Sequence, residues 1–176
     1  MKTKNSRFNH LLCWAVAGAL AIVAASVSAA EDSLIEDRLL IIDALAQYSY
    51  RWDGKDSSAF AELFTDDGII ERRVGGELVA GSRVQGRPAI LEYARQSHEF
   101  RLADRQTRHH FSALTFLELD SSHAVTQNMA LITHQTAGSD PPFINGSGIY
   151  RITWRKTTAG WKMTNRVLHS DRFIPQ

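Results

Sequence analysis

The sequence predicts an α+β domain in which three N-terminal helices pack in a curved antiparallel sheet. Apolar residues recur at helical spacing between residues 34 and 52, and Pro88 suits the first turn of a later helix. Beyond Thr107 the pattern changes to long alternating segments that are typical of β-strands. Helices followed by a run of strands favour an α+β architecture, with helices on one face of the sheet.

The first 29 residues are expected to be a secretory signal peptide rather than part of this domain. Lys2, Lys4 and Arg7 precede a short apolar run that ends in small residues, SVSAA, which is the usual order of a signal's three regions. An uncleaved anchor is the alternative, but the apolar run is short for a membrane span of about 20 residues. We therefore expect a periplasmic or secreted domain of residues 30–176, with no stable membrane insertion after cleavage.

Charge and cysteine content exclude several functional classes. Removing residues 1–29 takes three basic and no acidic residues from totals of 20 and 19, which leaves 17 basic against 19 acidic residues, a formal charge of −2. No basic patch points to a nucleic-acid partner. The only cysteine, Cys13, lies in the predicted signal. The mature chain would therefore have no disulfide, thiol nucleophile or cysteine-bound zinc.

The predicted elements follow one another without a repeat or linker. Ser33 is a candidate N-cap for the first helix, which ends near Trp52. A short second helix, SSAFAELF, begins near Asp56 or Ser57. The segments GIIERRV and ELVAGSRV flank a Gly-Gly pair as a hairpin, and RPAILEYARQSHEF forms the third helix. The later strands are expected at about 107–119, 124–136, 147–157 and 161–170, with the loop TAGSDPPFINGSG between the middle two.

The first two long strands predict a register that brings two histidines together. With Ser121 and Ser122 at the turn, His109 would lie directly opposite His134, with Cβ atoms about 5 Å apart. The same apolar face, which suits a ligand pocket, would carry Phe111, Ala113, Thr115 and Leu117, opposite Ile132, Ala130, Asn128 and Thr126. The other face, with His110, Leu114 and Phe116, is too apolar for solvent and suggests a dimer interface.

The two facing histidines are candidates for general acid–base chemistry. Imidazoles in an apolar cavity need partners, and they titrate near neutral pH. A structural pair satisfied by backbone groups or by each other is the alternative. His110 is expected to be a surface or interface residue. Two histidines form an incomplete metal site, which Asp53 could only in principle complete, so no metal is expected.

A second group of reactive side chains, YSYRWDGKD, lies at the end of the first helix. Tyr48, Trp52 and Asp53 follow one another over its last turns. An acid at a helix C-terminus is disfavoured by the helix dipole, so Asp53 needs compensation, which a neighbouring imidazolium would supply. Aromatic core packing and an aspartate that caps the following turn are the alternative interpretation.

These features resemble the SnoaL-like branch of the NTF2-like superfamily. The resemblance rests on the order of elements, on Y....D.KD at the end of the first helix, on T.H at a strand start, on the second histidine, and on GW.M..R in the last strand. It covers about residues 33–170. It implies a cone of curved sheet closed by three helices around a deep cavity, usually dimeric through the sheet face.

The branch includes scytalone dehydratase, the bile acid 7α-dehydratases and polyketide cyclases. The resemblance to scytalone dehydratase implies catalytic roles for His109, His134 and Asp53, while the bile acid enzymes add matches at Tyr48 and Arg166. Two departures stand out. Glu71-Arg72 lies where scytalone dehydratase has a first-strand tyrosine, and strand alternation gives Arg166 the parity opposite to Trp161, Met163 and Val167, which would turn it away from the cavity.

The favoured function is a cofactor-independent dehydratase that acts on a hydrophobic, ring-containing small molecule. His109, alone or with His134, would act as base and acid, Asp53 would orient an imidazole, and Tyr48 would stabilise developing enolate charge. Arg166, Phe111, Asn128 and Trp52 are the expected substrate-binding residues. An isomerase or cyclase of the same family and a non-catalytic periplasmic binding protein are the two alternatives.

Overall fold

A computed structural model describes residues 32–138 and 141–172, which fall into two units divided after Arg38. The described part of the first unit is helical. The second unit holds the rest of this helix, residues 39–53, together with the whole sheet. The predicted signal peptide lies outside the described residues. Among those residues, no helix has the length and apolar character needed to cross a membrane.

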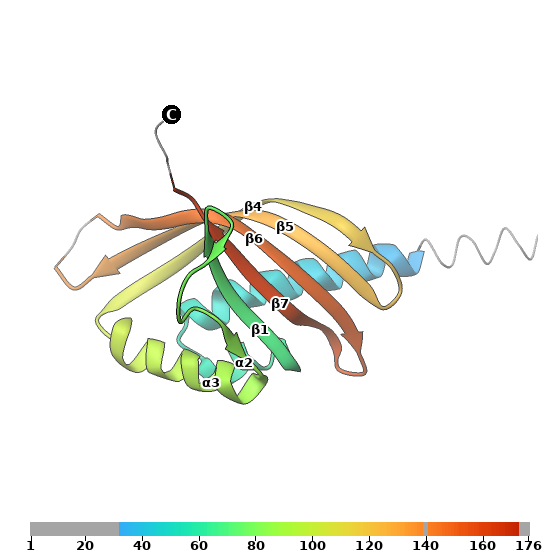
Figure 1. The fold of residues 1–176 in the computed structure, drawn as a ribbon, viewed down its shortest axis with the longest axis horizontal. Helices are drawn as coiled ribbons and strands as arrows, with labels where there is room; N and C mark the ends of the chain where they lie inside the picture. The colour runs from blue at the N-terminus through green and yellow to red at the C-terminus, as the bar shows by residue number, and fades with distance from the viewer. Residues whose placement is uncertain (1–31, 139–140, 173–176) are drawn as a thin grey trace, which may run out of the picture. The chain divides into compact units, whose positions relative to one another are not determined.

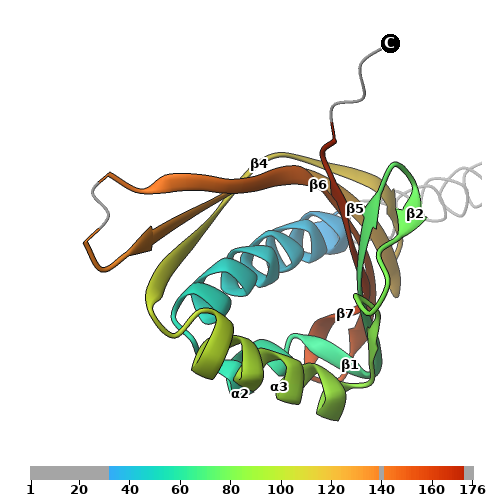
Figure 2. The ribbon, with the colours of Figure 1, turned by 60° about the vertical axis from the view of Figure 1, so that its left-hand side comes forward.

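The second unit combines three α-helical segments with a curved, seven-stranded mixed sheet (Figure 1). After the first helix come α2 (Ser57–Ala61), β1 (Phe64–Val74), β2 (Glu77–Leu78), β3 (Val84–Gln85), α3 (Arg87–Gln96), the π-helical segment η1 (Ser97–Arg101), β4 (Arg105–Leu119), β5 (His123–Thr136), β6 (Phe143–Thr157) and β7 (Gly160–Ser170). The α-helical segments of this unit lie on one side of the sheet, with β4, β5 and β6 arching over residues 39–53 of the first helix (Figure 2).

The strand order is β2-β1-β7-β6-β5-β4, and β3 also pairs with β1. All pairs are antiparallel except β1 and β7, which run parallel, so the sheet is mixed rather than purely antiparallel as predicted. A parallel pair needs a long connection between its strands. Here the connection contains α3 and the whole β4–β6 meander, so the last strand can run beside the first in the same direction.

Sheet pairing shifts two of the predicted boundaries. The short second helix ends at Ala61 rather than Phe64, because Phe64 begins β1 and pairs with Met163 of β7. The strand β6 begins at Phe143, inside the segment predicted as a loop, because Phe143 pairs with His134. In both cases sheet pairing with a distant strand overrides the local preference of the sequence.

The first helix is held by a buried stripe along its inner face. Ile41, Leu45, Tyr48 and Trp52 are nearly inaccessible, whereas Leu39 and Ile42, apolar residues of the same helix, are 59% and 42% exposed. The aromatic members pack on α2, since the Tyr48 and Trp52 rings lie 5.1 and 4.8 Å from the ring of Phe60. Burial of each such side chain stabilises the fold by about 1.5–3 kcal/mol. This packing fixes the end of the helix and thereby the position of Asp53.

The β4–β5 hairpin keeps its predicted register only near the turn, where Leu119 pairs with Ala124. Two irregularities, between Phe116 and Glu118 and between Ser112 and Thr115, each shift the pairing by one residue. His109 therefore pairs with Ile132, and His134 pairs with Thr107. Because the two shifts together preserve the alternation, His109 and His134 still share a face, as diagonal rather than direct neighbours.

Between the two irregularities, the predicted faces of β4 are exchanged. Leu114 and Phe116 are half-buried and pack against the core, whereas Thr115 and Leu117 are exposed. Ala113, at the first irregularity, has a φ of +53°, a conformation that non-glycine residues adopt mainly at turns and bulges. The assignment of Thr115 and Leu117 to the inner face was therefore wrong, because a one-residue slip exchanges the two faces of a strand.

Candidate active site

Asp53 and His109 form a hydrogen-bonded pair where the first helix meets β4. The Nδ1 atom of His109 lies 2.8 Å from Oδ1 of Asp53, and the backbone N–H of His109 donates to Oδ2 at 2.8 Å. The hydroxyl of Thr107 donates to Oδ1 at 2.6 Å. Gln106 adds a side-chain hydrogen bond to the backbone carbonyl of Asp53, at 2.8 Å. These donors at the start of β4 therefore offset the unfavourable position of the Asp53 carboxylate at the C-terminal end of the helix dipole.

The electrostatics of this pair select one tautomer of His109. Burial alone would raise the pKa of Asp53, but the hydrogen bonds from the His109 ring, Thr107 and the His109 backbone outweigh it and hold the pKa below its usual value. An ionised carboxylate only accepts hydrogen bonds, so the proton of a neutral His109 ring resides on Nδ1. Its Nε2 atom then carries a lone pair, as in a histidine that acts as general base.

Tyr48 and Arg166 form a second buried pair. The guanidinium of Arg166 donates to the Tyr48 hydroxyl oxygen at 2.6 Å, and it lies 4.8 Å above the ring of Tyr150. Burial raises the pKa of Tyr48 well above its usual range, so Tyr48 keeps its proton at neutral pH. The Tyr48 and His109 rings are 5.8 Å apart, which places a phenol donor beside the Asp53–His109 pair.

A bulge in β7 places Arg166 inside, contrary to the parity argument. Thr153 pairs with Asn165 but Trp154 pairs with Met163, so one extra residue of β7 lies between these pairs. The alternation changes at this point, and Arg166 becomes buried and lines a cavity. Sequence alternation alone does not reveal such a bulge.

His134 is buried but is not bonded to His109. Within the described chain, no hydrogen bond joins His134 to Asp53 or His109, and its Nδ1 atom has no partner. Burial lowers the pKa of His134, and the charges of Arg105 and Arg101 lower it further. His134 is therefore neutral at neutral pH, beside the Asp53–His109 pair rather than coupled to it.

Two cavities meet at His109. The larger, of about 750 Å³, lies between the first helix and β4, and its lining includes Asp53, Phe111 and Asn128. The smaller, of about 510 Å³, is lined by Trp52, Tyr48, His134 and Arg166, among others. His109 lines both cavities. All eight residues expected at the site therefore line one of two adjoining cavities.

His110, the neighbour of His109, points away from both cavities. Its side chain is exposed, and its Nε2 lies 3.2 Å from the Thr133 hydroxyl on the outer face of the sheet. The expected division between an inner and an outer histidine is therefore confirmed. Over residues 32–138 and 141–172, no three His, Asp or Glu side chains are arranged to hold a metal ion.

Two site residues were not predicted from the sequence. Thr107 bonds to Asp53, and Tyr150 lies under the Arg166 guanidinium. Thr107 shares the strand parity of His109, so the T.H motif contained the signal that identifies it. Tyr150 lies on β6 opposite Asn128, and only the assembled sheet places it beside Arg166.

Several solved structures resemble this chain. Rv3472 from Mycobacterium tuberculosis, a protein of unknown function, is 29% identical, with 81% of this chain and 76% of that chain covered and a TM-score of 0.69. An NTF2-like protein with a cystatin-like fold from Novosphingobium aromaticivorans is 26% identical, covers 81% and 86%, and also has a TM-score of 0.69.

A candidate scytalone dehydratase from Novosphingobium aromaticivorans has the same fold, with a TM-score of 0.68 at 21% identity over 83% of this chain and 93% of that chain. No curated protein sequence matches the chain. The model of the SnoaL-like domain matches residues 33–167. The described fold and this match together show that the chain belongs to the SnoaL-like family of NTF2-like proteins.

Proposed function

We propose that the protein is a cofactor-independent dehydratase of a hydrophobic, ring-containing small molecule. The observation that carries this proposal is the 2.8 Å contact between Asp53 and the Nδ1 atom of His109, in a ring that borders both cavities. A buried carboxylate that orients a histidine favours proton transfer by the other ring nitrogen.

The reaction follows from the positions of these groups. The Nε2 atom of His109 takes a proton from a carbon next to a carbonyl, and Asp53 stabilises the imidazolium that forms. Tyr48, supported by Arg166, donates a hydrogen bond to the carbonyl oxygen as it gains negative charge. The electron pair then forms a C=C bond while the C–O bond to the neighbouring hydroxyl breaks. The imidazolium returns its proton to this hydroxyl, which leaves as water.

The larger cavity supports a mostly apolar substrate. Its lining includes Ile42, Leu45, Phe111 and Leu114, and its volume of about 750 Å³ lies within the range typical of small-molecule sites. Asn128 supplies a buried amide whose Oδ1 has no partner among the described residues, so it can accept a hydrogen bond from a substrate hydroxyl. The dehydratase name of one structural neighbour is consistent with this chemistry.

The proposal is tested with a panel of cyclic β-hydroxy ketones in heavy water. Proton NMR detects exchange of the hydrogen next to the carbonyl, and mass spectrometry detects the loss of water. We expect His109→Asn to lower both rates by about 10²–10⁴-fold, the usual contribution of a general acid–base residue. His110→Asn, on the outer face, is the matched control and should retain the wild-type rates.

Three outcomes distinguish this proposal from the alternatives. If the His109→Asn variant exchanged protons and lost water at the wild-type rates, His109 would not be the catalytic base. Exchange or rearrangement without loss of mass would identify an isomerase. Tight binding of these ketones without exchange in the wild-type protein would identify a binding protein.

We also propose that the protein is exported and self-associates through the outer face of the sheet. Met129, Leu131 and Ile149 are 58%, 38% and 39% exposed there, and Met129 pairs with Ile149. Such a patch favours association. N-terminal sequencing of the mature protein tests export. Light scattering with a Met129→Glu variant tests the dimer, which the variant should dissociate; a monomeric wild-type protein would contradict it.

A further inference from the structure

Three arginines line the smaller cavity without a paired acid. Arg72, Arg101 and Arg166 border it, and Glu71 is the only acidic residue in its lining. Within the described chain none of the three guanidinium groups belongs to an ion pair. Arg72 donates to the hydroxyl of Ser170 at 2.9 Å, and Arg101 donates to that of Ser97 at 3.1 Å.

Arg166 is the innermost of the three, with 6% of its surface exposed. Its two hydrogen bonds go to neutral oxygens, the hydroxyl of Tyr48 at 2.6 Å and the backbone carbonyl of Glu71 at 3.4 Å. Its Nε atom is buried and has no partner among the described residues. A buried charge is costly without a partner of opposite charge, so this guanidinium is arranged to receive a negatively charged group.

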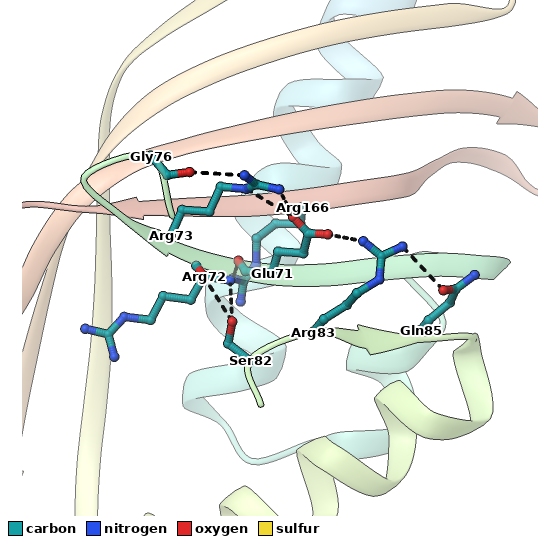
Figure 3. A network of polar contacts seen from close by, with 8 residues as sticks. All are labelled: Glu71, Arg72, Arg73, Gly76, Ser82, Arg83, Gln85 and Arg166. Carbon is teal, nitrogen blue, oxygen red and sulfur yellow. Dashed lines mark hydrogen bonds and ion pairs between the residues drawn. The ribbon is translucent and has the colours of Figure 1, made fainter. Parts of the chain in front are cut away.

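Glu71 does not serve as the counter-ion. Its carboxylate is bound by Arg73, at 3.1 Å, and by Arg83, as Figure 3 shows. Arg83 comes from the segment before β3, and Arg73 also donates to the carbonyl of Gly76 in the β1–β2 turn. The negative charge of Glu71 is therefore neutralised by this network, and the positive charges of the cavity remain unbalanced.

We propose that the smaller cavity binds a carboxylate of the substrate, so that the substrate is an apolar ring compound that carries an acid group. This inference rests on the proposed function, because it assigns the apolar body to the larger cavity and the reacting carbon to His109, where the cavities meet. Guanidinium groups match the planar geometry of a carboxylate and bind it through charge-assisted hydrogen bonds.

A matched pair of ligands tests the charge preference. The neutral fluorophore N-phenyl-1-naphthylamine serves as the reporter, and 1-naphthylacetate and 1-naphthylacetamide compete for its site. Direct calorimetry with the two competitors provides a second measurement. The acid and the amide share their size and aromatic body. We expect the acid to bind about tenfold more tightly at low salt, since hydrogen bonds to charged groups are the stronger ones, and this preference should shrink in high salt.

Arginine variants test whether the smaller cavity causes the preference for the acid over the amide. The double variant Arg72→Gln, Arg101→Gln removes the exposed charges of the cavity and leaves the buried Arg166 in place, so the fold is retained. It should reduce the preference at least threefold while amide binding stays unchanged. Arg151→Gln is the control, because Arg151 is exposed and pairs with Val167 on the outer face of the sheet.

The outcomes separate this inference from the proposed function. Equal affinity of the wild-type protein for the acid and the amide would overturn the assignment of a carboxylate to the smaller cavity. The assignment would also fail if Arg151→Gln abolished the preference for the acid while the double variant kept it. The His109→Asn variant should keep the preference for the acid. An acid preference in a protein that exchanges no ketone proton would support the cavity assignment and reject the dehydratase.

Discussion

Two buried carboxylates, Asp53 and Glu71, differ in the partners that hold them. They are 6% and 3% exposed, respectively. Asp53 accepts from a histidine ring, a hydroxyl and a backbone N–H beside a cavity, while Glu71 is held by two arginines from the β1–β3 region. A histidine can exchange protons near neutral pH, whereas an arginine cannot. Burial of an acid therefore does not identify a reactive site, and the chemistry of its partner does.

The largest expected difference between the two carboxylates is in turnover. Asp53→Asn should lower the rate of proton exchange by about 10²–10⁴-fold, because an amide no longer fixes the Nδ1–H tautomer or stabilises the imidazolium. Glu71→Gln should leave this rate within about twofold. Exchange rates of the two purified variants, measured on one active ketone, test the contrast. A similar decrease in the exchange rate of both variants would contradict this difference between Asp53 and Glu71.

The second difference is in stability, because the ion pairs of Glu71 hold the fold together and take no part in the proposed reaction. Glu71→Gln should reduce the free energy of unfolding by about 1–2 kcal/mol, because Arg73 and Arg83 lose a charged acceptor but are themselves partly solvated. Urea denaturation measures this change. Arg155→Gln, which breaks an exposed pair with Asp67, is the control and should change stability by less than about 0.5 kcal/mol.

The third difference is in acid sensitivity. Because the pKa of Asp53 is lower in the folded protein than in the unfolded chain, its contribution to stability is present above about pH 4 and is lost as the pH falls through the folded value. The gap in unfolding free energy between the wild-type protein and Asp53→Asn should therefore narrow below about pH 4. Denaturation curves at several pH values measure the gap, and a constant gap would contradict the assigned hydrogen bonds.

The smallest expected effect concerns the support of Asp53. Thr107→Val keeps the side-chain shape but removes the 2.6 Å hydrogen bond to Oδ1. We expect a loss of about 1 kcal/mol in stability and a decrease in exchange rate of about fivefold, since the His109 contact remains. Thr115→Val, at an exposed position on the same strand, serves as the control in both assays. Wild-type rates and stability in Thr107→Val would show that His109 and the backbone hold Asp53 unaided.

Much of the fold and part of the site could be predicted from local patterns. The first helix, the hairpin turn and the opposite faces of His109 and His110 follow from the periodicity of apolar residues, which is a property of the chain itself. Asp53 was found because an acid at the end of a helix is locally unfavourable. The partner that compensates it lies 56 residues away, and its identity rested on a resemblance rather than on spacing.

The remaining features depend on irregularities that local patterns do not encode. Two bulges in β4 make His134 a diagonal neighbour of His109 and exchange the faces of Leu114 and Thr115. A bulge in β7 turns Arg166 inward. Each bulge inserts one extra residue into a strand, and a shift of one residue reverses the face that the following side chains occupy.

The amino-acid sequence alone specifies which chemical groups the protein has: an acid at a helix end, a histidine on each of two consecutive strands, and no cysteine after the predicted signal. The packing of the sheet and helices sets which of these groups come into contact. It joined Asp53 to His109, left Nδ1 of His134 without a hydrogen-bond partner beside them, and paired the Glu71 carboxylate with Arg83 instead of Arg166. The reason is that hydrogen bonds of about 3 Å depend on strand register and bulges, which only the packing of the whole sheet sets.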